Sequence, residues 1–131
     1  MFRSTNAGLG LLILRVVIGL VFLMHGIGKL THMDNTIGFF TQIGIPMANL
    51  AAWVMALVET AGGVALILGV ALPIVALMLA IDMVVAILKV QLRKGLIGGY
   101  ELELTLLAGL VCLMLAGPGI MAVQIRPRPQ T

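Results

Sequence analysis

Four long apolar runs dominate the chain, and each contains only a few polar side chains. They cover residues 7–29, 46–69, 72–92 and 101–122. Each run approaches the ~20 residues that an α-helix needs to cross the ~30 Å hydrocarbon core of a bilayer. None shows the alternation of apolar and polar positions that is typical of strands in a membrane barrel. The pattern predicts an all-α integral membrane protein, a four-helix bundle that forms a single domain over residues 1–131.

The connections between these runs predict where the helices end. Residues 31–45 form a longer loop. This loop suits a short amphipathic helix at the membrane surface, whose apolar positions are Ile37, Phe39, Phe40 and Ile43. Residues 69–73 predict a tight hairpin, because proline is tolerated in the first turn of a helix. The Gly-Pro-Gly triplet at residues 117–119 is expected to end or kink the fourth helix near Ala116.

Composition excludes the commoner soluble classes. Hydrophobic residues make up 61% of the 131 residues and charged residues 10%, whereas soluble domains average about 45–50% apolar and about 25% charged. A soluble fold of this size has too little interior to bury so many apolar side chains. A soluble enzyme, a nucleic-acid partner and a disordered tail are therefore poor interpretations. The net charge of +3 is attributed to loop cations near lipid headgroups.

Cysteine and histidine are too few for a resident cofactor. The single Cys112 permits neither an intrachain disulfide nor dithiol chemistry. His25 and His32 are the only histidines, which is too few for a zinc site or a haem with two histidine ligands. We therefore expect no metal site and no intrinsic cofactor.

Arg15, Glu59 and Asp82 are placed near the middle of three different spans. Counting ~1.5 Å per residue from the span ends puts Arg15 about 12 Å, and both carboxyl groups about 15 Å, from the side of the termini. We therefore expect Arg15 to contact Glu59 or Asp82 in one layer, since an unpaired charge at this depth is costly. One cation does not balance two carboxylates, so one carboxyl group is expected to hold or share a proton. Such a layer could bind a polar ligand group or handle protons, or it could only hold the bundle together.

A second polar layer is predicted towards the far side of the membrane. His25 lies one turn before Lys29 and is a further candidate for hydrogen bonding to a ligand. Lys29 or Lys89 is expected within salt-bridge reach of Glu101 or Glu103, which open the fourth span from the same side. The alternative is that these cations extend to the interface and form only loose pairs.

Small side chains surround Glu59 on its own helix. They lie three, four or seven positions from it and are Ala52, Ala56, Gly62 and Gly63. Small residues let neighbouring membrane helices approach closely, and they could equally leave room for a flat apolar ligand.

Six short motifs, in order along nearly the whole chain, resemble the DoxX family of small bacterial four-helix membrane proteins. They are Leu14-Arg15, His25-Gly26-x-x-Lys29, Phe39-Phe40 with Gly44-Ile45-Pro46, Glu59-x-x-Gly62-Gly63 with Leu68-Gly69, Gly99-Tyr100-Glu101 and Gly117-Pro118-Gly119. Two positions depart from the family pattern. Residues 120–122 are Ile-Met-Ala where members often carry Ser-x-Asp, and Glu103 is an additional acid.

The resemblance implies a multi-pass protein of the bacterial cytoplasmic (inner) membrane, in contact with the lipid bilayer. It further implies a small subunit of a redox system that interacts with quinone or a sulfur species. Arg15, Glu59 and Asp82 would then form the polar end of a pocket, and a membrane or peripheral oxidoreductase subunit would supply the other electron carrier. Two other interpretations stay open, a proton-coupled transporter of small molecules and a non-catalytic scaffold. A homo-oligomer is a further assembly that the sequence allows.

Overall fold

The computed structural model describes residues 4–123, which fold almost entirely into helices. The elements are α1 (Ser4–Thr31), α2 (Met33–Gln42), α3 (Ala48–Leu68), α4 (Leu72–Ala86), the short helical turns η1 (Ile87–Gln91), η2 (Leu92–Lys94) and η3 (Leu96–Tyr100), and α5 (Glu101–Ala116). Within this part of the chain, four helical stretches are long and apolar enough to cross a membrane: Asn6–Thr31, Ala48–Leu68, Leu72–Lys94 and Leu96–Ala116. The predicted all-α, four-span membrane fold is confirmed.

The predicted hairpin between α3 and α4 also occurs. Gly69 adopts a left-handed conformation with φ of 73°. The backbone N–H of Val70 donates to the carbonyl of Ala65 at 2.9 Å, which closes the helix as a Schellman motif does. Pro73 then stands in the first turn of α4.

The fourth span ends earlier than its apolar pattern suggested. α5 stops at Ala116, and Gly117 leaves the helix with φ of 89°. Extending this span to residue 122 on hydrophobicity alone is therefore wrong. The Gly-Pro-Gly triplet gave the correct end, because a left-handed glycine followed by proline cannot continue an α-helix.

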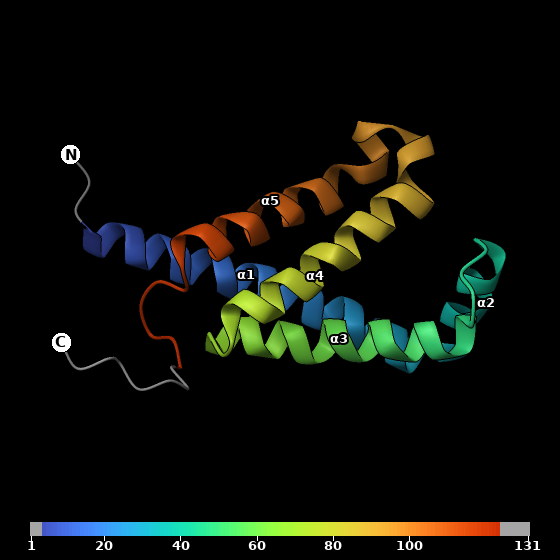
Figure 1. Cartoon of the computed structure of the whole chain (residues 1–131), viewed down its shortest axis with the longest axis horizontal. Coiled ribbons are helices and arrows are strands. Elements are labelled where there is room, and N and C mark those ends of the chain that lie inside the picture. Colours follow the sequence, from blue (N-terminus) through green and yellow to red (C-terminus); the bar gives the residue numbers. More distant parts are fainter. Residues whose placement is uncertain (1–3, 124–131) are drawn as a thin grey trace.

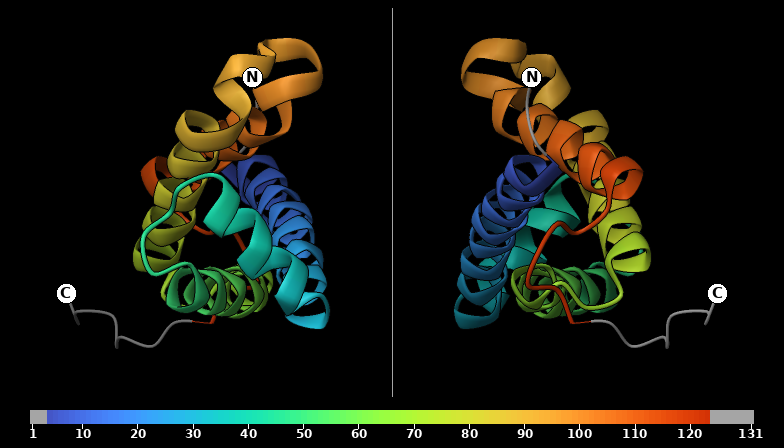
Figure 2. Two further views of the ribbon diagram at one scale, coloured as in Figure 1. Left: turned by 90° about the vertical axis from the view of Figure 1, so that its right-hand side faces the viewer. Right: turned by 90° about the vertical axis from the view of Figure 1, so that its left-hand side faces the viewer.

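The helices form two pairs. α1 packs against α3 and α4 packs against α5, and the second pair diverges from the first towards the end that carries α2 (Figure 1). α2 lies across that end of the bundle (Figure 2), where the amphipathic pattern of the loop had predicted a short helix. The start of α1 and the end of α5 lie together at the opposite end.

Small residues let α1 and α3 pack with their backbones in contact. A Cβ atom on Gly63 would lie 2.5 Å from the backbone nitrogen of Leu23 and 2.6 Å from the carbonyl oxygen of Gly19. On the neighbouring face, a Cβ atom on Gly62 would lie 3.1 Å from the side chain of Leu79 in α4. Gly62 and Gly63, two of the small residues near Glu59, therefore serve close helix packing.

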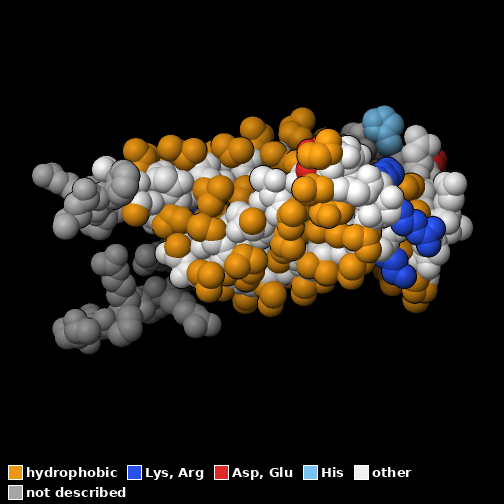
Figure 3. Space-filling view, turned by 90° about the horizontal axis from the view of Figure 1, so that it is seen from above, with side chains coloured by type: hydrophobic (Ala, Val, Ile, Leu, Met, Phe, Trp, Pro, Cys, Tyr) orange, Lys and Arg blue, Asp and Glu red, His pale blue; other side chains and the backbone are white. Residues whose placement is uncertain are grey.

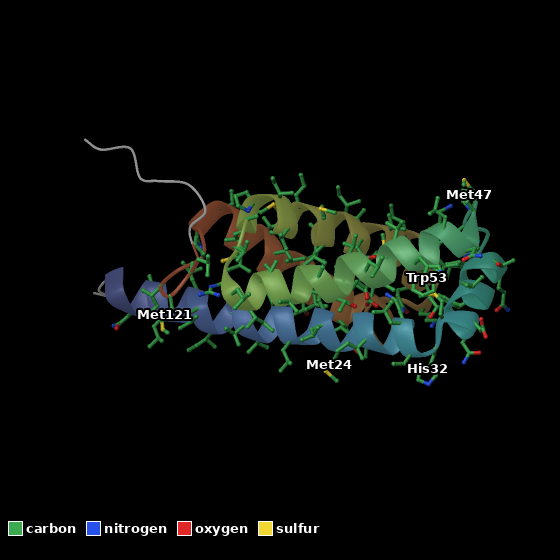
Figure 4. The ribbon with its side chains drawn as sticks, turned by 90° about the horizontal axis from the view of Figure 1, so that it is seen from below. Met24, His32, Met47, Trp53 and Met121 are labelled. Atoms are coloured by element: carbon green, nitrogen blue, oxygen red, sulfur yellow. The ribbon has the colours of Figure 1, made fainter. Side chains whose placement is uncertain are left out.

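The outer surface is apolar along most of its length. On α1, a stripe with helical spacing faces outwards, and it consists of Leu9, Ile13, Val17, Leu20 and Met24. Hydrophobic side chains cover the body of the bundle, while Lys and Arg side chains gather at the α2 end (Figure 3). Met24 and Met47 point away from the helices (Figure 4). Lipid is the solvent that accommodates such a surface.

Candidate functional site

A buried ion pair joins α1 to α3. Glu59 lies in the middle of α3 with 2% of its side chain exposed, and its Oε1 accepts a hydrogen bond from the Nζ of Lys29. Lys29 stands near the end of α1. The antiparallel packing of α1 on α3 sets this contact, because Gly26, one turn before Lys29, sits directly against Thr60, the residue after Glu59. Pairing stabilises a charge that would be costly alone at this depth.

Asp82 of α4 completes a cluster that we term the inner cluster, made of Lys29, Glu59 and Asp82. The contact between Gly62 and Leu79 sets the register of α4 on α3, which brings Asp82 level with Glu59. Asp82 is 6% exposed and lies within electrostatic reach of both other members. The oxygens Glu59 Oε2 and Asp82 Oδ2 are buried without a hydrogen-bond partner. Two carboxyl groups beside one ammonium can hold an additional proton between them.

The inner cluster lines a cavity of about 470 Å³. The cavity lies where α4 and α5 diverge from α1 and α3, and α2 contributes to its wall. Most of the lining is aromatic or aliphatic, including Phe22, Phe39, Phe40, Met55, Met83 and Leu106. A mostly apolar cavity with a few convergent polar groups, in the range of about 300–1,000 Å³, is typical of sites for small organic ligands.

Further polar side chains reach the same cavity. His25, Lys89 and Glu103 all line it. The ring nitrogen His25 Nδ1 lies 2.8 Å from the carbonyl oxygen of Val21, so we assign the proton to Nδ1, which leaves Nε2 as an acceptor. Glu103 Oε2 is buried and has no hydrogen-bond partner.

The expected pairing of the far layer is wrong. Among residues 4–123 the only ion pair joins Lys29 to Glu59, so neither Lys29 nor Lys89 pairs with Glu101 or Glu103. Glu101 instead accepts a hydrogen bond from the backbone N–H of Gly98 at 3.0 Å, in the turn before α5. The physical reason is the reach of the lysine. The side chain of Lys29 extends inwards to a buried carboxylate on the adjacent helix, rather than outwards to α5.

Arg15 lies apart from the inner cluster, so the expected contact with Glu59 or Asp82 is wrong. Its guanidinium is fully buried and uses its donors on backbone carbonyls alone. Nη1 donates to Leu66 and Ile67 at 3.1 and 2.5 Å, Nε to Pro118 at 2.8 Å, and Nη2 to Ile120 and Met121 at 2.8 and 2.9 Å. These carbonyls belong to the last turn of α3 and to residues 117–123, which we term the return segment.

The expected contact of Arg15 failed because α1 and α3 are shifted relative to each other along the axis of the bundle. Gly19 of α1 faces Gly63 of α3, so Arg15, one turn earlier, is level with the end of α3. Glu59, eight residues before Ile67, lies about 12 Å farther along the bundle. The depth estimate assumed that α1 and α3 end at the same level, whereas α1 projects beyond α3. The C-terminal carbonyls of a helix carry partial negative charge, so they stabilise a cation without any carboxylate.

The return segment fixes this arrangement. The backbone N–H of Ile120 donates to the carbonyl of Gly8 at 3.3 Å, and that of Val123 donates to Leu68 at 3.0 Å. Sequence reasoning missed these partners because backbone carbonyls have no residue signature. It also missed the role of Phe39 and Phe40 in the cavity wall, although their pattern did predict the helix that carries them.

Comparison with known proteins agrees with this architecture. The family model described as DoxX matches residues 10–92. The chain is 36% identical over 115 residues to the Bacillus subtilis protein named "Putative oxidoreductase CatD", covering 88% of this chain and 84% of that protein. It is 36% identical over 120 residues to "Uncharacterized membrane protein Rv3486" of Mycobacterium tuberculosis, covering 81% of this chain and 74% of that protein. "Inner membrane protein YphA" of Escherichia coli is 32% identical over 59 residues, 45% of this chain and 42% of that protein. No solved structure matches the chain. Since the family model covers more than half of its length, the chain belongs to the DoxX family.

Proposed function

We propose that this chain is the membrane-embedded subunit of a bacterial oxidoreductase system in the cytoplasmic membrane, and that its cavity binds a ring compound of the quinone class. The observation that carries the proposal is the placement of the inner cluster on the wall of a mostly apolar cavity. The name of the Bacillus subtilis relative supports the oxidoreductase context.

The residues around the cavity fit such a ligand. A quinone ring is flat and apolar and carries polar oxygens at its edge, so it needs apolar walls and a few polar groups at one end. Phe22, Phe39 and Phe40 supply aromatic surface. Buried polar atoms normally have partners. The oxygens Glu59 Oε2 and Asp82 Oδ2 have none in the described part of the protein, and a proton held on one of the two carboxyl groups can be donated to a ring oxygen of the ligand. A bound quinone would supply electron and proton transfer chemistry, while the inner cluster would hold a proton near its oxygens.

A sulfur oxyanion fits this cavity less well. Binding such an anion needs cations that are free of carboxylate partners, whereas Lys29 is already paired with Glu59. Glu59, Asp82 and Glu103 would repel an anion from the same wall. Lys89 is then the one cation of the described cavity lining outside an ion pair, and it is exposed.

Ligand titration tests the proposal. The protein in lipid nanodiscs is titrated with decylubiquinone and, under anaerobic conditions, with its reduced form, and binding is followed by calorimetry. We expect saturable binding of at least one form. Glu59→Gln keeps the side-chain shape and removes the charge, so it should weaken binding by about tenfold or more, since a hydrogen bond to a charged group contributes about 1.5–3 kcal/mol.

Asp34→Asn is the matched control, because Asp34 is exposed on α2 and does not line the cavity. Failure of both forms to bind would contradict the proposal. If Glu59→Gln lowers the melting temperature but leaves ligand affinity unchanged, the inner cluster only holds the bundle together and the protein is a scaffold. Proton-coupled uptake of a cation into vesicles, without binding of either form, would favour the transporter.

A further inference from the structure

The cavity joins the inner cluster to one end of the bundle. Asp82 lines its inner part, and Gln91 lines it about 13 Å farther along α4 and η1, towards the end that carries α2. Several polar side chains gather at this outer part, and they are Asn35, Thr36, Lys89 and Gln91. Asn35 and Lys89 are exposed. Such an entrance favours water over lipid, because lipid cannot satisfy polar groups.

The interior of the cavity suits water and protons. A volume of about 470 Å³ holds several water molecules, since each occupies about 30 Å³ in the liquid. Three carboxyl groups and two ammonium groups line it, from Glu59, Asp82, Glu103, Lys29 and Lys89. These charges do not sum to a positive value, so they raise no electrostatic barrier against a proton.

The opposite half of the bundle is closed. Between the inner cluster and Arg15 the helices pack through an apolar core. The core members without any exposed surface are Leu66, Ala76, Leu79, Leu110 and Leu113. Among residues 4–123, the only buried polar side chains are Arg15, Glu59 and Asp82. Arg15 therefore stands alone beyond this core, as a fixed cation that repels protons.

We propose that the cavity is a one-sided proton path, which opens the inner cluster to water on the α2 side of the membrane and leaves it closed to the other side. Glu59 and Asp82 then exchange their shared proton with one compartment only. The inference goes beyond the proposed function, because it holds whichever ligand the cavity binds. Protons that a bound ligand takes up or releases cross the α2 side.

Cysteine labelling in sealed liposomes tests the sidedness, in a Cys112→Ser background. Met55→Cys places a thiol in the cavity wall, one turn before Glu59. A charged methanethiosulfonate reagent that cannot cross the bilayer is added outside, and the labels on each molecule are counted by intact mass spectrometry. Asp34→Cys marks the α2 end and Asn6→Cys marks the opposite end, since both residues are exposed.

The two double variants give opposite outcomes whichever way the protein inserts. With Asp34→Cys, each Met55→Cys molecule should carry two labels or none. With Asn6→Cys, each should carry one label. Ala51→Cys, one turn nearer the α2 end on the same wall, repeats the test with a smaller change. The reverse pattern, labelling of the cavity thiol from both sides, or no labelling at either position would overturn the one-sided path.

Infrared spectroscopy tests whether the path carries protons. In nanodiscs both faces of the protein meet D₂O, and a protonated carboxyl group gives a C=O band that shifts on exchange. We expect a band that Asp82→Asn removes or shifts. Its exchange should become several-fold slower after N-phenylmaleimide blocks Met55→Cys, but not after it modifies Asp34→Cys outside the cavity.

A blocked protein that exchanges at the unblocked rate would reveal a second route through the other half of the bundle. Absence of the band, or a band that neither Glu59→Gln nor Asp82→Asn affects, would show that the inner cluster holds no proton. Either result would overturn the proton path. Quinone binding is measured separately, so the proposed function would still stand.

Discussion

Replacement of Arg15 is expected to loosen the end of the bundle where the start of α1 meets residues 117–123. The side chain makes five hydrogen bonds to carbonyls of α3 and the return segment. Side-chain hydrogen bonds inside membrane proteins contribute on average about 0.6 kcal/mol each, so Arg15→Met should lose about 3 kcal/mol of unfolding free energy. Arg15→Lys keeps the charge but offers three donors on one atom, so it should lose an intermediate amount.

Equilibrium unfolding in mixed micelles measures this loss, with Arg93→Met as the control because Arg93 is exposed on η2. A cysteine introduced at Ala122, in a Cys112→Ser background, reports on the return segment. Ala122 packs against Gly69 beside the Arg15 guanidinium. Maleimide should therefore label it faster once Arg15 is replaced.

The separation of Arg15 from the inner cluster can be refuted by a double-mutant cycle. Arg15 and Glu59 act about 12 Å apart along the bundle and share no partner. The losses caused by Arg15→Met and Glu59→Gln should therefore add to within about 0.5 kcal/mol. A larger coupling energy would mean that Arg15 and Glu59 interact directly, as the predicted single layer of charges required. If Arg15→Met is as stable as the wild-type protein, the five hydrogen bonds of Arg15 do not stabilise the fold.

Two further substitutions test the packing of α1 on α3. Lys29→Met leaves Glu59 buried without its cation and should lower the unfolding free energy by about 3 kcal/mol or more, as measured by melting. Adding Glu59→Gln should recover much of this loss. A double variant no more stable than Lys29→Met would contradict the ion pair. Gly63→Ala places a methyl group 2.5 Å from the backbone of Leu23 and should cost about 1–3 kcal/mol. Gly28→Ala meets open space, so equal losses in the two glycine variants would refute this close contact.

Local chemistry explains why the helices could be predicted. Helix ends depend on a few residues near them, so Gly69, Pro73 and the triplet at residues 117–119 marked ends that the structure reproduces. The apolar residues Phe39 and Phe40 likewise predicted the short helix α2 from its own sequence alone. Spans need only length and hydrophobicity, which the sequence displays directly.

The partners of the buried charges depend on the relative level of helices, which no local pattern encodes. Arg15 and Glu59 are separated by about two turns of helix because α1 and α3 pack through Gly19 and Gly63. A count of residues from each span end treats all helices as level, so it placed them together. Side-chain direction adds a second error, since the side chain of Lys29 can extend either towards the membrane surface or towards the interior of the bundle.

The two buried charged centres differ in how completely their hydrogen bonds are satisfied, and this difference favours the inner cluster as the proposed ligand site. Arg15 has five N–H donors and meets five carbonyls, so nothing at that centre is left to bind a ligand. The inner cluster keeps Glu59 Oε2 and Asp82 Oδ2 unpartnered on the wall of a cavity. A membrane interior penalises every unsatisfied polar group, so these two oxygens require either a proton held between them or a partner in the cavity. The position of these oxygens on the wall of a cavity, rather than the depth of the charges, is therefore the ground for proposing the inner cluster as the ligand site.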